Sequence, residues 1–563
     1  MTRRLLLILG LLALAGSFVP AQPASAAGGC RPGVSFLVGA AKADITPKVW
    51  PVAEAAYSIG RLGYTAAHPF WARSVAIRSC ADASTVVMTS LDSQGYYSAY
   101  KEDPVGAEGF GTDGIRSAAA KATGVPVSHL VVTSTHTHNS PDSIGVWGGG
   151  SQGNNKAPYL AVVKAGAVKS VKDAVAALRP ARLLLGTADI GFLQSTVSQV
   201  GADPKDYPVD STMRVLQAVG FADCRPITTL VNASIHATVA GEIKDKKGRD
   251  VIDPDWPGRV ATDLERLLPG EIPVVIPGAV GRTQTRFPKG QTPKSTDPLV
   301  QIAAYGDILT RRIGTALASA TSVGAGPVKA DQAFLTEEIE DPALVALFYD
   351  EAGVPGPTGP ALGGLMRSVL PPYTVGNTVR AEAQLLRVGD LAFAGVPGEA
   401  YPQNATELAV RIKARASFVL GMANDQVGYT PPAYEYPLVA LVDGGDEGIF
   451  TINPHLGSDL VNQHLTSARV LGFATTGTEP YLGTGTVVPP DQFTPADQPP
   501  VAEPAERSLT LPCAAARAAA SPPRPVASGQ GLPSTGLSAP WTGAGVLALS
   551  LFLIRASRRR RTG

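Results

Sequence analysis

Short apolar runs alternate along the chain with longer segments in which apolar residues recur at helical spacing. The apolar runs predict strands in residues 36–45, 73–78, 84–92, 129–132, 181–186, 212–218, 228–235, 273–277, 380–388 and 391–396. Helical spacing predicts helices in residues 114–122, 158–178 and 298–320, and a loop leading into a helix across residues 255–265. Because strands and helices alternate throughout, we expect a mixed α/β (α+β) fold.

The first 26 residues have the pattern of a secretory signal peptide. Arg3 and Arg4 precede an apolar stretch at 5–19, and the Ala-Ser-Ala sequence at 24–26 offers a small-residue cleavage site. This apolar stretch is short for a membrane span. We therefore expect an exported protein whose mature chain begins at Ala27.

Residues 532–563 form a second targeting signal. An LPxTG motif precedes an uncharged, mostly apolar segment and a tail with five arginines; its sorting residues are Leu532, Pro533, Thr535 and Gly536. This order resembles the cell-wall sorting signal of Gram-positive bacteria, which implies that a sortase cleaves after Thr535 and joins it to peptidoglycan. The apolar segment would hold the chain in the membrane transiently, with the arginines on the cytoplasmic side. A permanent single-span membrane anchor is the alternative.

Composition places the functional part of the chain between these two ends. Lys and Arg number 48 and Asp and Glu number 47, so the net charge of +1 gives no reason to expect a nucleic acid or another polyanion as partner. Residues 487–531 are rich in Pro and Ala, as in a linker that crosses a cell wall. Residues 30–486 remain, and we expect them to form one large catalytic domain.

The four cysteines permit two disulfides in an exported protein. Three pairings are possible. Cys80 and Cys224 each follow a predicted strand, in what look like hairpin turns, whereas Cys30 and Cys513 lie at the two margins of the folded part. We therefore predict the pairs Cys30–Cys513 and Cys80–Cys224.

Three predicted strands each lead into a residue that could bind a metal ion. His136 and His138 follow the strand at 129–132, and two residues at this spacing on an extended segment share one face. His236 ends the strand at 228–235, and Glu399 follows a strand through Pro-Gly. A carboxylate at such a place is costly to bury unless it is paired or bound to metal. Ordinary hydrogen-bonded histidines and a solvated loop glutamate are the alternatives.

Five short motifs, in matching order across residues 36–436, resemble those of the neutral (non-lysosomal) ceramidases. The motifs are residues 38–47, 135–141, 232–236, 255–258 and 397–399. The resemblance implies one zinc ion bound by His136, His236, Glu399 and Tyr429, with His138 facing the substrate carbonyl or stabilising the oxyanion that develops there. Two imidazoles and a carboxylate are a common ligand set in zinc hydrolases.

The chain departs from this family at two places. The loop that supplies a catalytic serine in ceramidases corresponds to residues 278–285, where Ala279 replaces the usual acid and Gly281 the usual serine. Thr283 of this loop is the candidate replacement hydroxyl, with Thr285 as an alternative, and Arg282 is a candidate substrate-binding residue. In addition, linker composition begins about sixty residues after Tyr429, which leaves no room for a full C-terminal immunoglobulin-like domain.

Together these patterns predict a zinc-dependent hydrolase that cleaves an N-acyl amide bond, as a ceramidase does, and is anchored to the cell wall. Zinc can activate water directly, so hydrolysis does not require the family serine. Two alternatives remain open. The chain could be a non-catalytic surface protein that binds a lipid or envelope ligand, or an esterase or amidase that acts on other acyl substrates.

Overall fold

The computed structural model describes residues 29–55, 60–100, 106–145, 147, 157–196, 209–341, 378–436 and 450–483. The predicted signal peptide, linker and sorting signal, together with Cys513, lie outside the described residues. Among the helices of the described part, none combines the length and hydrophobicity needed to cross a lipid bilayer.

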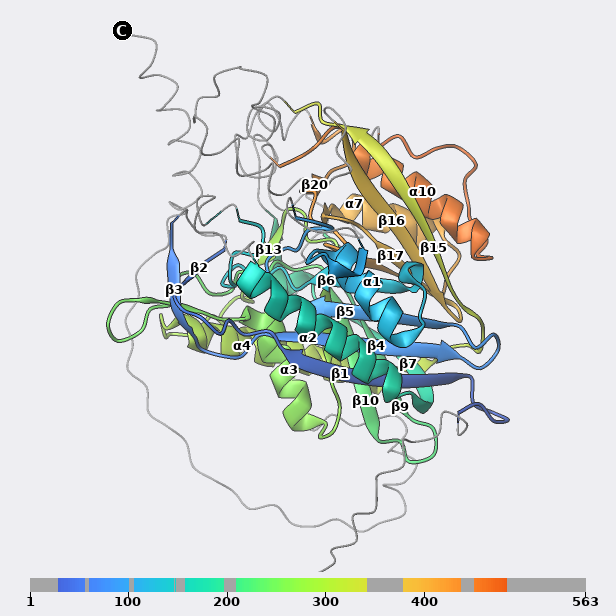
Figure 1. The fold of residues 1–563 in the computed structure, drawn as a ribbon, viewed down its shortest axis with the longest axis horizontal. Helices are drawn as coiled ribbons and strands as arrows, with labels where there is room; N and C mark the ends of the chain where they lie inside the picture. The colour runs from blue at the N-terminus through green and yellow to red at the C-terminus, as the bar shows by residue number, and fades with distance from the viewer. Residues whose placement is uncertain are drawn as a thin grey trace, which may run out of the picture.

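A nine-stranded mixed sheet forms the centre of the molecule (Figure 1). Its strands lie in the order β12 (Val274–Pro277), β10 (Pro226–Ala233), β9 (Thr212–Gly220), β7 (Arg179–Asp189), β1 (Phe36–Asp44), β4 (Trp71–Ser79), β5 (Thr85–Leu91) and β6 (Leu130–Ser134), with β14 (Thr321–Ser322) beside β7. Neighbours are antiparallel except for the parallel pairs β10–β12 and β5–β6. Both parallel pairs lie at the ends of this order, one at each end.

The sheet curls so that these two ends approach each other, as the right-handed twist of strands favours. Strand β12 contacts β5 and β6, and the Ser90 hydroxyl donates a 2.6 Å hydrogen bond to the Val275 carbonyl. Just past the strand ends, Thr137 and Ala237 form a parallel bridge between the segment after β6 and the segment after β10. The curl therefore brings together two loops that lie far apart in the sequence.

A second, four-stranded sheet packs against the curled sheet. Its order is β15 (Val328–Glu338), β16 (Thr378–Val388), β17 (Leu391–Gly395) and β19 (Ala416–Leu420). The rings of Phe393 and Phe418 stack with centroids 4.4 Å apart, within an apolar core to which both sheets contribute. The Asn232 amide donates to the Val419 carbonyl at 2.8 Å, which fixes the end of β19 against β10.

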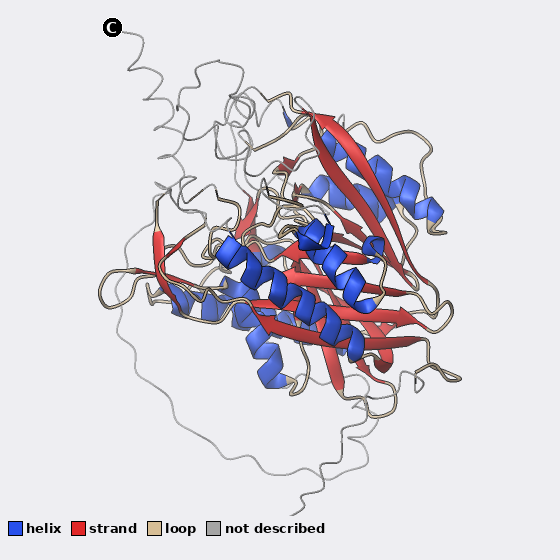
Figure 2. Ribbon diagram, in the orientation of Figure 1, coloured by secondary structure: helices blue, strands red, loops and turns tan. Residues whose placement is uncertain are grey.

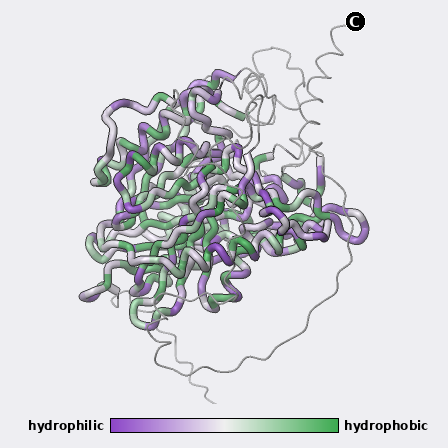
Figure 3. The backbone as a smooth tube through the Cα atoms, turned by 180° about the vertical axis from the view of Figure 1, so that it is seen from behind, coloured by the Kyte–Doolittle hydropathy of each residue, from purple (hydrophilic) through white to green (hydrophobic). Residues whose placement is uncertain are grey.

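Helices cover the outer faces of both sheets (Figure 2). Helix α2 (Ala157–Ala176) lies across β1 and β4 beside α1 (Thr112–Thr123), while α3 (Asp255–Leu267) and α4 (Pro298–Ala318) pack on β12, β7 and β9. Helices α7 (Pro402–Arg411) and α10 (Leu456–Val470) cover the four-stranded sheet. Hydrophobic residues follow the packed strands and helices, and hydrophilic stretches are frequent at the periphery (Figure 3).

The remaining elements are short. There are three small sheets in the described part of the chain. The first contains β11 (Asp250–Ile252), β3 (Leu62–Ala66) and β2 (Val52–Ala53). The second pairs β13 (Thr283–Thr285) with β8 (Gln194–Thr196), and the third pairs β18 (Glu399–Ala400) with β20 (Tyr429–Thr430). Short 3-10 turns lie at Gly106–Glu108, Val127–His129 and Gly191–Leu193. Of these elements, β13, β18 and β20 border the site described below.

The predicted fold class is confirmed, and each predicted strand and helix overlaps an observed one. The largest difference in a helix boundary concerns α3, which already begins at Asp255 instead of after a loop. Pro257 is compatible with this start because a proline in the first turn gives up a backbone N–H that has no intrahelical partner there. Of the strands that the sequence did not predict, the longest is β15, most of whose residues are exposed or only partly buried.

The predicted disulfide pairs are wrong, because Cys30 pairs with Cys80. Strand β1 pairs antiparallel with β4 so that Phe36 faces Ser79, and the Cys80 N–H donates to the Ser35 carbonyl at 2.9 Å. Residues just before β1 therefore lie beside residues just after β4. Cys224 is also disulfide-bonded. The sequence correctly indicated the turns in which Cys80 and Cys224 lie, but it did not reveal which strands are neighbours.

Glu271 is a buried carboxyl group in the turn between α3 and β12. Its side chain is 2% exposed, one oxygen accepts a 2.9 Å hydrogen bond from the Thr229 hydroxyl, and the other has no partner in the described part of the chain. Burial raises the pKa of Glu271 to about 8, although the Thr229 hydrogen bond opposes this. The folded protein therefore holds a proton on Glu271 at a pH at which the unfolded chain has lost it.

We expect the Glu271→Gln variant to gain stability relative to the wild-type protein as the pH rises from about 4.5 to about 8. In that window the folded wild-type protein binds more protons than the unfolded chain, so its free energy of unfolding falls by up to about 1.4 kcal/mol per pH unit through this group. Glutamine keeps the shape and cannot titrate. Urea unfolding at pH 5, 6.5 and 8 measures the difference, and parallel pH profiles for the two proteins would contradict the prediction.

Candidate metal centre

His136 lies in a strained turn directly after β6. The strand ends at Ser134, and His136 has a φ of 60°, in the left-handed region that a residue with a side chain rarely adopts. The segment is therefore not extended as expected, although the side chains of His136 and His138 do meet at one place. The His138 N–H donates to the Ala237 carbonyl at 3.2 Å and helps to hold this turn. Strain that the surrounding structure maintains in this way is typical of functional sites.

Backbone carbonyl groups orient the rings of His136 and His236. The Nδ1 atom of His136 lies 2.7 Å from the Gln94 carbonyl oxygen, and that of His236 lies 2.9 Å from the Thr283 carbonyl oxygen. A carbonyl oxygen can only accept, so in each neutral ring Nδ1 carries the hydrogen and Nε2 keeps its lone pair. This is the arrangement in which a histidine binds a metal ion through Nε2.

Glu399, the first residue of β18, brings a carboxylate to these two nitrogens. Its Oε2 atom lies 3.2 Å from Nε2 of His236 and 3.4 Å from Nε2 of His136. All three side chains are at most 5% exposed. Within the described residues, neither Oε2 of Glu399 nor Nε2 of His236 has a hydrogen-bond partner. Buried polar atoms without partners are costly, and the cost disappears when a cation lies between them.

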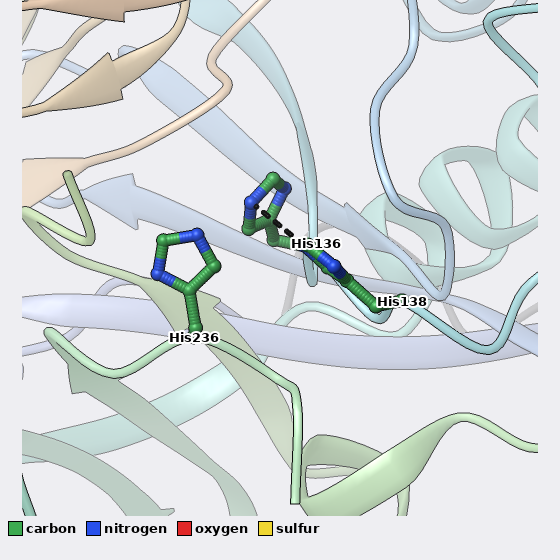
Figure 4. Close-up of side chains that lie close together, drawn as sticks. All are labelled: His136, His138 and His236. Carbon is green, nitrogen blue, oxygen red and sulfur yellow. Dashed lines mark hydrogen bonds between the residues drawn. The ribbon is translucent and has the colours of Figure 1, made fainter. Parts of the chain in front are cut away.

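His138 adds a third imidazole to the group (Figure 4). Its Nε2 atom lies 3.2 Å from Nε2 of His136, and the ligand atoms of His136, His138 and His236 all lie within 4.8 Å of one another. The ring centroid of His138 lies 4.8 Å from that of His136 and 5.5 Å from that of His236. Three imidazoles and one carboxylate thus gather at one point, where the ends of β6, β10 and β17 meet.

Burial and mutual proximity change the proton affinities of these groups. Burial raises the pKa of the Glu399 carboxyl, but the nearby charges of the His136 and His236 imidazoles outweigh burial and hold this pKa well below its usual range. For His136, burial lowers the pKa, but the Glu399 carboxylate outweighs it and the net pKa is raised. Burial, together with the other two imidazoles, lowers the pKa of His138 well below its usual value.

Tyr429 lies on the strand next to Glu399. It is the first residue of β20, which pairs in parallel with β18 so that Tyr429 and Glu399 are register partners. Partners in a ladder project to the same face of the sheet. Tyr429 is 9% exposed. The backbone thus places it next to a candidate ligand, and its role as the fourth ligand stays a prediction.

The loop after β12 leaves no space for the serine that the family resemblance led us to look for. A Cβ atom on Gly281 would lie 2.7 Å from the Tyr401 ring and 2.9 Å from the Ala400 carbonyl oxygen. The Gly281 N–H also donates to that carbonyl at 2.9 Å, which holds this loop against β18. Glycine at this position is therefore required by close packing behind Glu399.

Thr283 and Arg282 occupy different surroundings in this loop. Thr283 is fully buried beside His236 and accepts two hydrogen bonds from it through its carbonyl group; its own hydroxyl has no partner in the described part of the chain. Arg282, 2% exposed, donates to the Glu435 carboxylate at 2.9 Å. The catalytic role of Thr283 and the substrate-binding role of Arg282 stay predictions.

Comparison with known proteins identifies the architecture. No family profile and no curated protein sequence matches the chain. Among solved structures, the crystal structure of neutral ceramidase from Pseudomonas aeruginosa matches 78% of this chain and 74% of its own, with a TM-score of 0.60 at 18% sequence identity. The fold is that of the neutral ceramidases. A ceramidase complexed with C2 matches 78% of this chain and 75% of its own, with a TM-score of 0.58 at 17% identity.

Two residues with a part in this site were not indicated by the sequence. Gln94 orients His136 through its backbone carbonyl, and the Gln426 side-chain amide donates to Oε1 of Glu399 at 3.3 Å. A backbone carbonyl leaves no trace in residue type, and an isolated glutamine is usually solvated. Of the two, only Gln426 could have been suspected from the sequence, because it lies three residues before Tyr429, the proposed ligand.

Proposed function

We propose that this protein is a zinc-dependent hydrolase that cleaves an N-acyl amide bond. The pair of buried, unpartnered atoms in the candidate metal centre, Nε2 of His236 and Oε2 of Glu399, carries the proposal. Ligand atoms about 2.0–2.1 Å from a tetrahedral zinc ion stand about 3.3–3.4 Å apart. The distances from Oε2 of Glu399 to Nε2 of His136 and to Nε2 of His236, 3.4 Å and 3.2 Å, fit that spacing.

His136, His236 and Glu399 would hold the ion, with His138 or Tyr429 beside them. A bound zinc ion supplies a Lewis acid that polarises the substrate carbonyl group and lowers the pKa of water. The chain contributes the rest. The Gln94 and Thr283 carbonyl groups fix the ring orientations, Glu399 supplies the negative charge, and the buried surroundings strengthen each electrostatic interaction by excluding water.

His138 is placed to interact with a substrate next to the proposed ion. Its Nε2 atom lies within hydrogen-bonding distance of Nε2 of His136, so displacement of that contact by a metal ion would free His138 to bind the ion or the substrate carbonyl oxygen. We propose the second role, which agrees with the expectation from the sequence. The export and wall anchoring expected from the two ends of the sequence stay predictions.

The proposed function predicts zinc content and amide hydrolysis in the same preparation. The full-length protein, folded with zinc present, should retain about one equivalent of zinc by mass spectrometry and release fatty acid from an N-acyl amine. A chelator should abolish release, and added zinc should restore it.

Zinc below about a tenth of an equivalent would contradict the metal site. Bound zinc without release of fatty acid from amide or ester substrates would instead favour the non-catalytic binding protein. That alternative is supported by the absence of space for a serine at position 281.

A further inference from the structure

Gln426 lies in a rigid turn between β19 and β20, directly behind Glu399. Met422 and Asn424 of this turn have positive φ values of 48° and 64°. The Gln426 N–H donates at 2.9 Å to a carboxylate oxygen of Asp425, which also accepts the Ser98 N–H at 3.0 Å. The backbone of Gln426 is therefore tied to the segment that follows β5.

The Gln426 side chain is fixed between that segment and the metal centre. It packs against Gly95, where an added Cβ atom would lie 2.9 Å from Cγ of Gln426. Gln94, the preceding residue, orients His136, whereas Gln426 donates to Glu399. One contact between two turns thus supports a proposed histidine ligand and the proposed carboxylate ligand.

The side-chain amide of Gln426 has one satisfied end and one unsatisfied end. A carboxylate can only accept, so the end of the amide that faces Glu399 must be its nitrogen. The other end, Oε1, has no hydrogen-bond partner within the described residues, although Gln426 is only 8% exposed. Leaving a buried acceptor of this kind unpaired is unfavourable, so a hydrogen-bond donor from a ligand would remove a real cost.

We propose that Oε1 of Gln426 accepts the N–H of the scissile amide and so makes the site selective for amides over esters. This assignment rests on the proposed hydrolase function. The carbonyl group that the metal centre would polarise is bonded to that nitrogen, and the Gln426 amide lies directly beside the carboxylate of that centre. An ester carries no hydrogen at this position and leaves Oε1 unpaired.

The test compares an amide and an ester with the same acyl chain. The two differ only at the bond to be cleaved, where the amide has N–H and the ester has an oxygen atom. The Gln426→Met variant keeps the size of the side chain but also removes the hydrogen bond to Glu399, so both substrates should lose activity. The loss in kcat/KM should be about 10-fold greater for the amide than for the ester, because only the amide also loses its acceptor. Equal losses for the two substrates would overturn the proposal and leave Gln426 as a positioning residue for Glu399 alone.

Gln217 provides a matched control. It is also buried with an unpartnered Oε1 atom, but it lies in β9 and its amide donates to the Thr229 hydroxyl. Gln217→Met should leave the ratio of amide to ester activity unchanged. Zinc content of each variant, measured in parallel, shows whether the metal site is intact.

A second variant keeps the test valid if Gln426→Met does not fold. Gly95→Ala retains Gln426 but pushes its side chain aside. Activity on the amide substrate should therefore again fall more than activity on the ester substrate, to a smaller degree than in Gln426→Met. Equal losses in this variant would also count against the proposal. Hydrolysis of neither compound by the zinc-loaded wild-type protein would overturn the proposed function itself, and the selectivity with it.

Discussion

Replacing Glu399 by glutamine is expected to weaken zinc binding by at least about 100-fold and to abolish hydrolysis. Loss of residues that merely support a ligand commonly costs 10- to 100-fold in metal affinity or activity, so loss of a ligand's negative charge should cost at least as much. The amide keeps the shape of the carboxylate. The Gln426 amide that now donates to Oε1 would remain in place.

Zinc titration and acyl-release assays on the Glu399→Gln variant measure both effects. Glu271→Gln is the matched control, because Glu271 is a buried carboxyl group whose hydrogen-bond partner is Thr229. It should bind zinc as the wild-type protein does. An unchanged zinc affinity in Glu399→Gln would show that the carboxylate is not a ligand and would leave the three histidines as the remaining candidate set.

Introducing a serine at position 281, as the resemblance to ceramidases would suggest, is expected to damage the protein. The new Cβ atom would meet the Tyr401 ring at 2.7 Å and the backbone oxygens of Ala400 and Glu399 at 2.9 Å and 3.0 Å. Real structures do not tolerate such distances, and the backbone of β18 cannot move without moving Glu399. We expect Gly281→Ser to lose about 1–3 kcal/mol of folding free energy, as overpacked sites commonly do, and to bind zinc more weakly.

Chemical unfolding and zinc titration measure these losses, and Gly281→Ala separates their causes. If crowding by Cβ is responsible, the alanine variant should lose as much stability as the serine variant. A serine variant that is as stable as the wild-type protein and hydrolyses the amide faster would contradict this. It would show that the loop can make room for the side chain and that the lack of a hydroxyl at position 281 limits activity in the wild-type protein.

The strands and helices that the sequence predicted correctly could be found because each has a local cause. The strand that leads to His136 reads as an apolar run, and helices α1, α2 and α4 follow from apolar residues at helical spacing. Even the turns that hold Cys80 and Cys224 could be found between pairs of strands. The motifs that resemble ceramidases also identified His136, His236 and Glu399 before any geometry was available.

Local patterns failed wherever the answer depended on which distant segments become neighbours. Cys30 pairs with Cys80 because β1 lies antiparallel to β4, a register that no spacing between cysteines encodes. The left-handed turn at His136 was missed because its stabilising contact comes from Ala237, about a hundred residues further along the chain. The position of the Gln426 side chain also depends on contacts with distant segments, so local patterns did not indicate it.

The sequence by itself determined the candidate ligands, the class of fold and the absence of a serine at position 281, because each of these is a property of residue identity or local periodicity. Only the tertiary structure decided that three imidazoles and a carboxylate meet at one point and that packing requires glycine at 281. Convergence depends on the curl of the nine-stranded sheet, which brings the ends of β6 and β10 together. Long-range strand pairing creates that curl, and no stretch of sequence contains it.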